Sequence, residues 1–231
     1  MTPPRGRGRP TLRSGVADLS ASEIIDAALR LSQDHGIDGF TVRMVSDELK
    51  VSQMALYQHF ADKQALIDAV ADAALGQIVA PSKDGRSWVD WMIAQAQETM
   101  RVFMDHPGLA SYVLGQGPLV LSDNALRVAD GILAVLHDAG FSELEAAHTY
   151  SASFSFVAGH VQLHSAAIAD HASVEAWLNS PAATRYNAFA RVTRALGADL
   201  EGDEIFEYGL RCLFAGIGLS RGRDGDPSQK D

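Results

Sequence analysis

The stretch that decides the fold runs from Thr41 to Tyr57 and reads TVRMVSDELKVSQMALY. Apolar residues recur at helical spacing up to Leu49 and again from Leu56, with Lys50-Val51 between the two runs. Ser52 stands where the second run needs an N-cap, because its hydroxyl can accept a hydrogen bond from an amide that the first turn leaves unpaired. The pattern predicts two short helices joined by a tight turn, a helix-turn-helix.

The second predicted helix begins at about Gln53 and presents a polar face. With Leu56 turned inward, its outward face holds side chains that can bond base edges and phosphates or pack against a thymine methyl group. These side chains are Gln53, Met54, Ala55, Tyr57, Gln58 and His59. Two short helices at a sharp turn also occur as plain packing elements in all-helical proteins. Periodicity alone therefore leaves a DNA-reading surface and a packing motif open.

Composition predicts an all-α protein. The chain has 231 residues, of which 47% are hydrophobic, and this is enough for one large or two smaller domains. Helix-favouring residues dominate, and alternating β-branched runs are few. The single cysteine, Cys212, excludes an intramolecular disulfide, and we expect it to be a small buried core residue. We see no signal-peptide pattern or apolar run of membrane-spanning length, so we expect a cytoplasmic protein without a membrane partner.

The net charge of −10 is unevenly distributed. The first residues include several arginines and no acidic residue, while the excess of acids lies chiefly in the C-terminal two thirds. This asymmetry favours a basic DNA-reading head carried by an acidic body. Around Arg7 and Arg9, the sequence R-G-R-P resembles the core of an AT-hook, which lies in the narrow minor groove of A·T-rich DNA. A non-specific basic tail is the alternative.

Capping signals and breaks divide the chain. A capping box at 20–23 opens the first helix, and Asp62 is the predicted N-cap of a fourth helix that ends at Val79. Two short helices are predicted around Trp177 and over 185–196, and a last helix over 203–220. The predicted units are a disordered basic arm (1–19), the helix-turn-helix domain (20–80), an effector-binding and dimerisation domain (86–220) and a disordered tail (221–231).

The segment from Ser22 to Leu75 resembles the DNA-binding domain of the TetR family of bacterial repressors. The shared pieces are the G-x-x-G-F-T lead-in, the L-x-V turn, the A-L-Y-x-H-F recognition helix and the D-K-x-x-L start of the fourth helix. The resemblance implies residues that face the bases or lie beside them: Arg43, Gln53, Ala55 and Gln58. It also implies residues that chiefly hold phosphates: Thr41, Ser52, Tyr57, His59 and Lys63.

The same resemblance implies a homodimer, a palindromic double-stranded operator, and repression that a small effector relieves. The chain contains no G-x-S-x-G elbow, H-E-x-x-H pair or phosphate-binding glycine loop, so an enzyme is disfavoured. A dimeric ligand-binding protein without DNA affinity remains an alternative.

From His106 to Val161 the chain is also similar to the effector-binding half of the tetracycline-repressor branch. Alignment on the shared glycine and the G-F-S corner puts Val113 where the drug repressor has a magnesium-ligating histidine. An apolar valine cannot ligate a hard cation. The expected effector is therefore not a magnesium–tetracycline complex, and we expect no resident cofactor.

The body is predicted to hold a mostly apolar pocket for a hydrophobic or aromatic molecule. Its predicted lining is Trp91, Phe103, His106, Leu114, Gln116, Leu133, Phe154 and His160. His160 and His164 stand one helical turn apart, a spacing at which two imidazoles can share a metal. A metal-responsive regulator is thus a further alternative, although we assign no metal ligand.

Small residues on two long helices predict the dimer interface, because they let helix backbones approach closely. They lie on the helix after Ser142 and on the last helix: Ala152, Ala158, Gly159, Gly209, Gly216 and Gly218. Internal packing is the alternative for such a stripe.

Overall fold

The structure is a computed structural model that describes residues 19–116, 122–165, 171–196 and 203–224. All regular elements in these ranges are helices, which confirms the predicted all-α class. Arg7 and Arg9 lie outside the described residues. The helices are α1 (Ala21–His35), α2 (Val42–Leu49), α3 (Gln53–Tyr57), α4 (Lys63–Gly76), α5 (Trp88–Asp105), α6 (Leu109–Gln116), α7 (Asp123–Asp138), α8 (Glu143–Ser165), α9 (His171–Leu178), α10 (Pro181–Arg185), α11 (Asn187–Leu196) and α12 (Asp203–Asp224).

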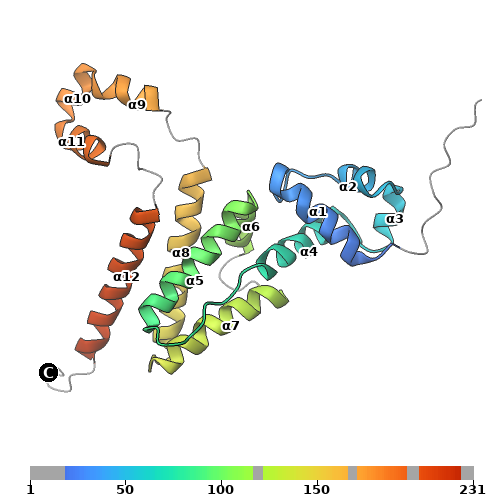
Figure 1. Ribbon diagram of the computed structural model, residues 1–231, viewed down its shortest axis with the longest axis horizontal. Helices are drawn as coiled ribbons and strands as arrows, with labels where there is room; N and C mark the ends of the chain where they lie inside the picture. Colours follow the sequence, from blue (N-terminus) through green and yellow to red (C-terminus); the bar gives the residue numbers. More distant parts are fainter. Residues whose placement is uncertain (1–18, 117–121, 166–170, 197–202, 225–231) are drawn as a thin grey trace, which may run out of the picture.

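Helices α1 to α4 form a head at one end of the molecule (Figure 1). The capping box that opens α1 is present: the Ser20 hydroxyl accepts the Glu23 amide, and the Glu23 carboxylate accepts the Ser20 amide. The α1 helix ends at Gly36, whose φ of 81° is a conformation that glycine adopts without strain. Between α2 and α3, Lys50 turns the chain with a φ of 57°. Apolar side chains from all four helices are buried in the head, among them Ile24, Val45, Leu56, Leu66 and Val70.

The α4 helix leads from the head into the body and ends earlier than predicted. It stops at Gly76 rather than continuing to Val79, which is 68% exposed. The carbonyl groups of Leu75, Gly76 and Ile78, at and just after the end of α4, accept hydrogen bonds from the Arg127 side chain. A side chain of α7 thus satisfies the end of α4.

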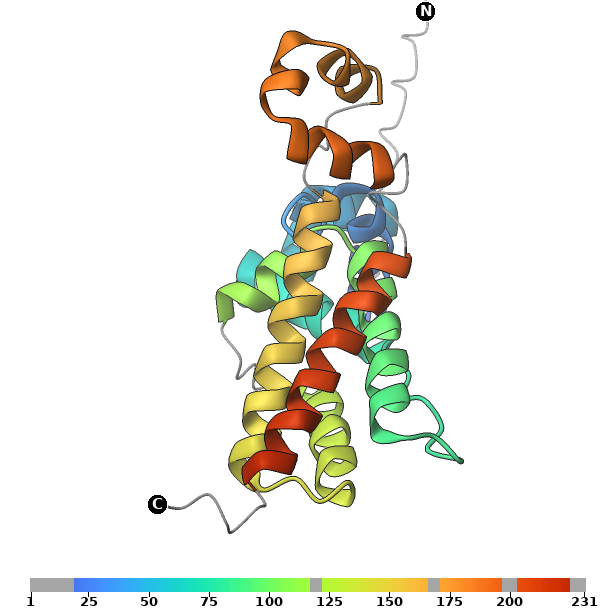
Figure 2. The same cartoon turned by 90° about the vertical axis from the view of Figure 1, so that its left-hand side faces the viewer.

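The body packs α5, α6, α7, α8 and α12 together. Figure 2 shows α8 and α12 side by side, on the side of the body away from the head. Trp88 of α5 packs edge-on against two rings, with centroids 5.0 Å from Phe141 and 5.6 Å from Phe214. This contact joins the start of α5 to the α7–α8 corner and to α12.

Several predicted details of the body need correction. The last helix does not stop at Ser220 but continues to Asp224, so the first part of the predicted disordered tail is helical. Residues 171–196 form three short helices rather than two, because Pro181 begins a separate helix, α10, as a proline at a helix start can. Cys212 is exposed, not buried, because the inward face of α12 is occupied by Phe206, Leu210 and Phe214.

Among the described residues, no helix is both long enough and apolar enough to cross a membrane.

Candidate nucleic-acid interface and ligand cavity

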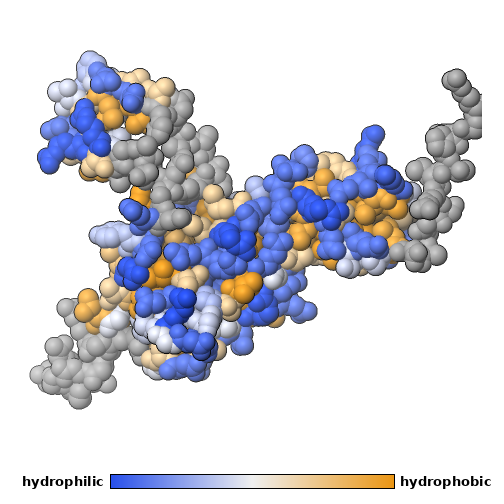
Figure 3. All heavy atoms as spheres, in the orientation of Figure 1, coloured by the Kyte–Doolittle hydropathy of each residue, from blue (hydrophilic) through white to orange (hydrophobic). Residues whose placement is uncertain are grey.

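The predicted reading surface lies at the tip of the head, on α2 and α3. The side chains of Arg43, Gln53, Tyr57, Gln58 and His59 are all exposed there. Figure 3 shows hydrophobic surface at the α3 end of the head, and the exposed apolar side chains of α3 are Met54 (70%) and Tyr57 (45%). Exposed apolar groups among polar ones suit contacts with thymine methyls and sugars. Met54 therefore joins the candidate contacts, although the resemblance did not assign it a role.

Ala55 does not belong to this surface. Its side chain is only 4% exposed, because α3 turns both Ala55 and Leu56 toward the head. The expectation that Ala55 faces the bases or lies beside them is therefore wrong for a side-chain contact. A helix of five residues has room for two inward positions, and Ala55 occupies one of them.

The hydroxyl groups predicted to hold phosphates cap helices. The Thr41 hydroxyl accepts the Met44 amide at 3.2 Å, and the Ser52 hydroxyl accepts the Ala55 amide at 3.3 Å. Each hydroxyl keeps its own proton, which can be donated to a phosphate oxygen. Lys63 begins α4, and its ammonium group donates to the carbonyl of Asp38 at 3.2 Å. These residues lie where the two short helices and α4 begin.

The body contains a cavity of about 820 Å³, within the range of natural small-molecule sites. Its walls come from α4, α5, α6, α7 and α8, and most lining side chains are apolar. Three of the eight residues that were predicted to line a pocket do line this cavity: Phe103, Leu133 and Phe154. Val113 also lines the cavity and is buried there.

The other five predicted residues lie elsewhere. The indole N–H of Trp91 donates to the carbonyl of Pro81 at 2.9 Å and so holds the segment after α4. Leu114 and Gln116 are exposed because α6 turns Val113, not its neighbours, toward the cavity. The ring of His160 packs against the Phe206 ring of α12, with centroids 4.8 Å apart.

His106 is the fifth misplaced residue, and it joins head to body. It is completely buried between Ser32 of α1 and Gln77 at the end of α4. Burial lowers the pKa of its imidazole, because desolvation disfavours the charged ring. The backbone makes a second connection beside it, where the Ile37 amide donates to the Pro107 carbonyl at 2.8 Å.

Several polar residues of the cavity lining were missed from the sequence, among them Gln95, Thr99 and Tyr150. Gln95 and Thr99 interrupt the apolar stripe of α5 one turn apart, and the Gln95 amide lies 3.4 Å from the Thr99 hydroxyl. On α8, burial raises the pKa of Tyr150, whose ring stacks near Phe154. A polar residue recurring at helical spacing within an apolar stripe was the available signal for Gln95 and Thr99.

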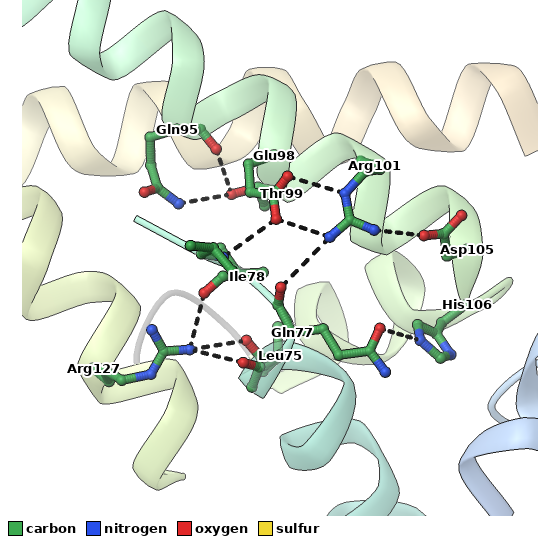
Figure 4. Close-up of polar contacts among 12 residues, drawn as sticks. Leu75, Gln77, Ile78, Gln95, Glu98, Thr99, Arg101, Asp105, His106 and Arg127 are labelled. Carbon is green, nitrogen blue, oxygen red and sulfur yellow. Dashed lines mark hydrogen bonds and ion pairs between the residues drawn. The ribbon is translucent and has the colours of Figure 1, made fainter. Parts of the chain in front are cut away.

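Side chains and a backbone amide of three body helices form hydrogen bonds with α4 and with the residues just after it. From α6, the Tyr112 hydroxyl donates to Asp68 at 2.6 Å. From α7, the backbone amide and side-chain amide of Asn124 donate to Asp72 at 2.9 and 3.0 Å. From α5, Glu98 accepts the Val79 amide at 3.3 Å (Figure 4). Leu75, in the last turn of α4, and Ile78, just after this helix, also line the cavity.

The described residues contain no group of three or more His, Cys, Asp or Glu side chains placed to hold a metal ion. The side chain of His164, the partner in the predicted histidine pair, lies outside the described residues.

Comparison with known proteins covers both halves of the chain. Residues 24–70 match the family model described as bacterial regulatory proteins, tetR family, and residues 80–220 match the one described as tetracyclin repressor-like, C-terminal domain. An HTH-type transcriptional regulator of Saccharopolyspora erythraea is 30% identical over 88% of this chain and 86% of its own length. The class C tetracycline repressor of Escherichia coli is 32% identical over 86% of this chain and 90% of its own length.

Solved structures share the fold. Apo ActR from Streptomyces coelicolor superposes with a TM-score of 0.76 at 23% identity, over 90% of this chain and 99% of ActR. A possible TetR family transcriptional regulator from Streptomyces coelicolor A3(2) gives a TM-score of 0.72 at 26% identity, over 86% of this chain and 98% of that chain.

TetR-family proteins are ligand-responsive transcriptional regulators that bind DNA as homodimers, and they are not enzymes. The helix-turn-helix head, the helical body and the matches along both halves all agree: this chain belongs to the TetR family of bacterial regulatory proteins.

Proposed function

We propose that the protein is a repressor that binds a palindromic operator as a homodimer and leaves it when a hydrophobic or aromatic molecule enters the body cavity. One observation carries the proposal: Leu75 and Ile78, at the end of the helix that leads from the reading head, are themselves part of the cavity wall. A molecule in the cavity therefore contacts α4 directly.

The character of the cavity supports an apolar effector. Met92, Ala96, Phe103, Phe154 and Val157 form its inner wall, and Gln95 and Thr99 offer polar contacts within it. Val113 occupies the aligned position of the magnesium-ligating histidine, and its side chain supplies no ligand for a hard cation. We therefore propose an effector that binds without magnesium, in agreement with the expectation from the sequence that a magnesium–tetracycline complex is not the effector.

The geometry of a dimer makes small movements sufficient for release. Two recognition helices must sit about 34 Å apart to enter successive major grooves on one face of DNA. A slight rotation of α4 against the body changes that separation. The effector can shift this equilibrium only by its differential affinity for the two states, which is about 1–3 kcal/mol in typical allosteric proteins.

The dimer face that we propose runs along α8 and α12. On α12, five exposed residues follow each other at helical spacing on one stripe: Ile205, Tyr208, Cys212, Gly216 and Leu219. On α8, Gly159 and Leu163 are exposed as well. A methyl group added at Gly159, Gly216 or Gly218 would meet nothing within 4 Å, so space for a partner is open there.

Two of the small residues predicted for this interface instead pack inside the chain. A methyl group at Gly209 would lie 2.4 Å from the Phe156 ring, so Gly209 makes room for that ring. Ala158 is completely buried. Internal packing, the alternative considered for the stripe, therefore applies to these two positions.

Selection of binding sites from random double-stranded DNA, followed by gel-shift titration, tests the DNA-binding part. The expected result is an enriched palindrome that binds far more tightly than a shuffled sequence of the same length. Enrichment of no sequence would favour a dimeric ligand-binding protein without DNA affinity. Release of the palindrome by a metal salt, and by no organic molecule, would favour a metal-responsive regulator.

A further inference from the structure

Arg127 of α7 connects the cavity to the end of α4. Its side chain is part of the cavity lining, and one terminal nitrogen, Nη2, donates to three carbonyls at the end of α4. The distances are 3.3 Å to Leu75, 3.3 Å to Gly76 and 3.1 Å to Ile78 (Figure 4). A cation at this position also suits the negative end of the helix dipole. Arg127 thus holds the end of α4 in place.

The guanidinium of Arg127 is exposed and has no ion-pair partner in the part of the chain that the structure describes. Within the described residues, no carboxylate lies within 4 Å of it, and its second terminal nitrogen, Nη1, makes no hydrogen bond. Asp72 of α4 accepts two hydrogen bonds from Asn124 and does not pair with Arg127. A carboxylate or sulfonate could take two short charge-assisted bonds from an arginine, in place of one nitrogen shared by three carbonyls at longer distances.

Arg127 is the only cationic side chain of the cavity lining in the described residues. Two acids, Asp123 and Asp130, stand on the same helix within one turn of it, and both are exposed. They disfavour an anion at the rim, but water screens these exposed charges, as it screens that of Arg127, and only the guanidinium can donate hydrogen bonds directly to the anion.

We propose that Arg127 binds the anionic group of the effector, so that the cavity takes an aromatic or otherwise apolar acid. In binding, the acid draws the guanidinium away from the carbonyls of Leu75, Gly76 and Ile78 and releases the end of α4. This inference rests on the proposed role of the cavity as the effector site, and it names both the chemical class of the effector and the residue that passes the signal.

Two fluorescent probes with the same ring skeleton test the anion site. The first is 8-anilinonaphthalene-1-sulfonate, and the second is N-phenyl-1-naphthylamine, which lacks the sulfonate. The wild-type protein should bind the sulfonate more tightly. The substitution Arg127→Met keeps much of the side-chain length without the charge, and it should weaken sulfonate binding about tenfold or more while leaving the neutral probe nearly unchanged.

Arg101→Met provides the matched control. Arg101 also reaches the end of α4, where it donates to the Gln77 carbonyl at 3.5 Å, but it pairs with Glu98 and Asp105 and does not line the cavity. This variant should bind both probes as the wild type does. Equal affinity of the wild type for the two probes, a preference for the neutral probe, or an unchanged sulfonate affinity in Arg127→Met would each overturn the anion site.

Hydrogen exchange tests the release of α4. The amides of Gln77 and Ile78 close the last turn of α4 by donating to the carbonyls of Ala74 and Leu75. In the wild type, saturation with the sulfonate should speed exchange in a peptide covering 75–79, relative to saturation with the neutral probe. Equal exchange with both probes would contradict the displacement of Arg127. Either negative result would overturn the role of Arg127 but would still allow the cavity to bind neutral effectors. The proposed function fails only if a molecule bound in the cavity does not release the protein from operator DNA.

Discussion

The Nδ1 atom of His106, in the body, lies 3.0 Å from the Oγ atom of Ser32, in the head, and both side chains are completely buried. The other ring nitrogen, Nε2, lies 3.2 Å from the Oε1 atom of Gln77 at the end of α4. A neutral ring can bond to both side chains, donating through one nitrogen and accepting through the other. One imidazole therefore ties α1, the end of α4 and the α5–α6 corner together.

The first prediction concerns pH. Desolvation lowers the pKa of His106 in the folded protein, and Asp105, which raises the pKa, has a smaller effect. In the unfolded chain the imidazole takes up a proton near pH 6.5, whereas the folded ring stays neutral until a lower pH. The contribution of His106 to the free energy of unfolding should therefore be constant above about pH 6.5. Below this pH it should decrease, by at most about 1.4 kcal/mol per pH unit for one proton.

Urea denaturation of the wild type and of His106→Asn at pH 7.5 and 5.5 measures this contribution. The variant should be less stable at pH 7.5 and should lose less stability on acidification. Ser32→Ala removes a contact partner but keeps the imidazole, so it should retain the pH dependence. The same pH dependence in the wild type and in His106→Asn would show that His106 does not cause it.

The second prediction separates positioning contacts from base-reading contacts on the head. Lys63→Ala should weaken binding to all DNA sequences and flatten the dependence on salt by about one unit, because one phosphate contact is lost. Gln53 is exposed, and we propose that its amide faces a base, so Gln53→Ala should relax preference at one position in each half-site. Gel-shift titrations on the selected palindrome and on random DNA, at several salt concentrations, measure both effects. Equal losses for both variants on both DNAs would show that the assigned roles are wrong.

The third prediction concerns the cavity. Ala96→Phe puts a ring into the cavity from α5, so it should weaken effector binding about tenfold or more. The variant should therefore stay bound to operator DNA when the effector is added. DNA affinity without the effector should stay within a few-fold of the wild type. Ala94→Phe, on the same helix but outside this cavity, is the control and should respond to the effector normally. Normal release of the Ala96→Phe variant would place the effector elsewhere.

The fourth prediction concerns assembly. Gly216→Leu adds a side chain where the single chain has open space, and leucine favours the helix over glycine by about 0.8–1 kcal/mol. The folded chain should therefore tolerate the change, while the dimer should not. Light scattering after gel filtration should give a monomer at micromolar concentration. Gly131→Leu, at an equally open position on α7, should remain a dimer, and a dimeric Gly216→Leu would remove this face from the proposed interface.

The head was largely predictable from the sequence because its signals are local. The capping box at Ser20, the N-caps Ser52 and Asp62 and the helical spacing around Leu56 all depend on residues within one turn of each other. Ala55 was placed on the outward face both by the helical pattern and by the resemblance, and both were wrong because its burial depends on how α3 packs in the head.

The cavity was only partly predictable because its lining depends on helix orientation in three dimensions. Phe103, Leu133 and Phe154 sit on faces that sequence periodicity already turns inward. For His106, the long-range contacts with Ser32 and Gln77 decide its place, and no local pattern encodes them. Arg127 is an exposed charge on α7, and no local pattern in the sequence indicates its contact with the end of α4.

Measuring how effector and operator affect each other's binding tests the central claim. This claim is that an effector in the cavity and operator DNA on the reading head weaken each other's binding through α4. Calorimetry would titrate an effector found by its ability to release the selected palindrome, first into the free protein and then into the protein–operator complex. Operator DNA should weaken effector binding by the same factor by which the effector weakens operator binding, about 5- to 150-fold. Identical effector affinity with and without operator would contradict the coupling, even if the protein binds both ligands.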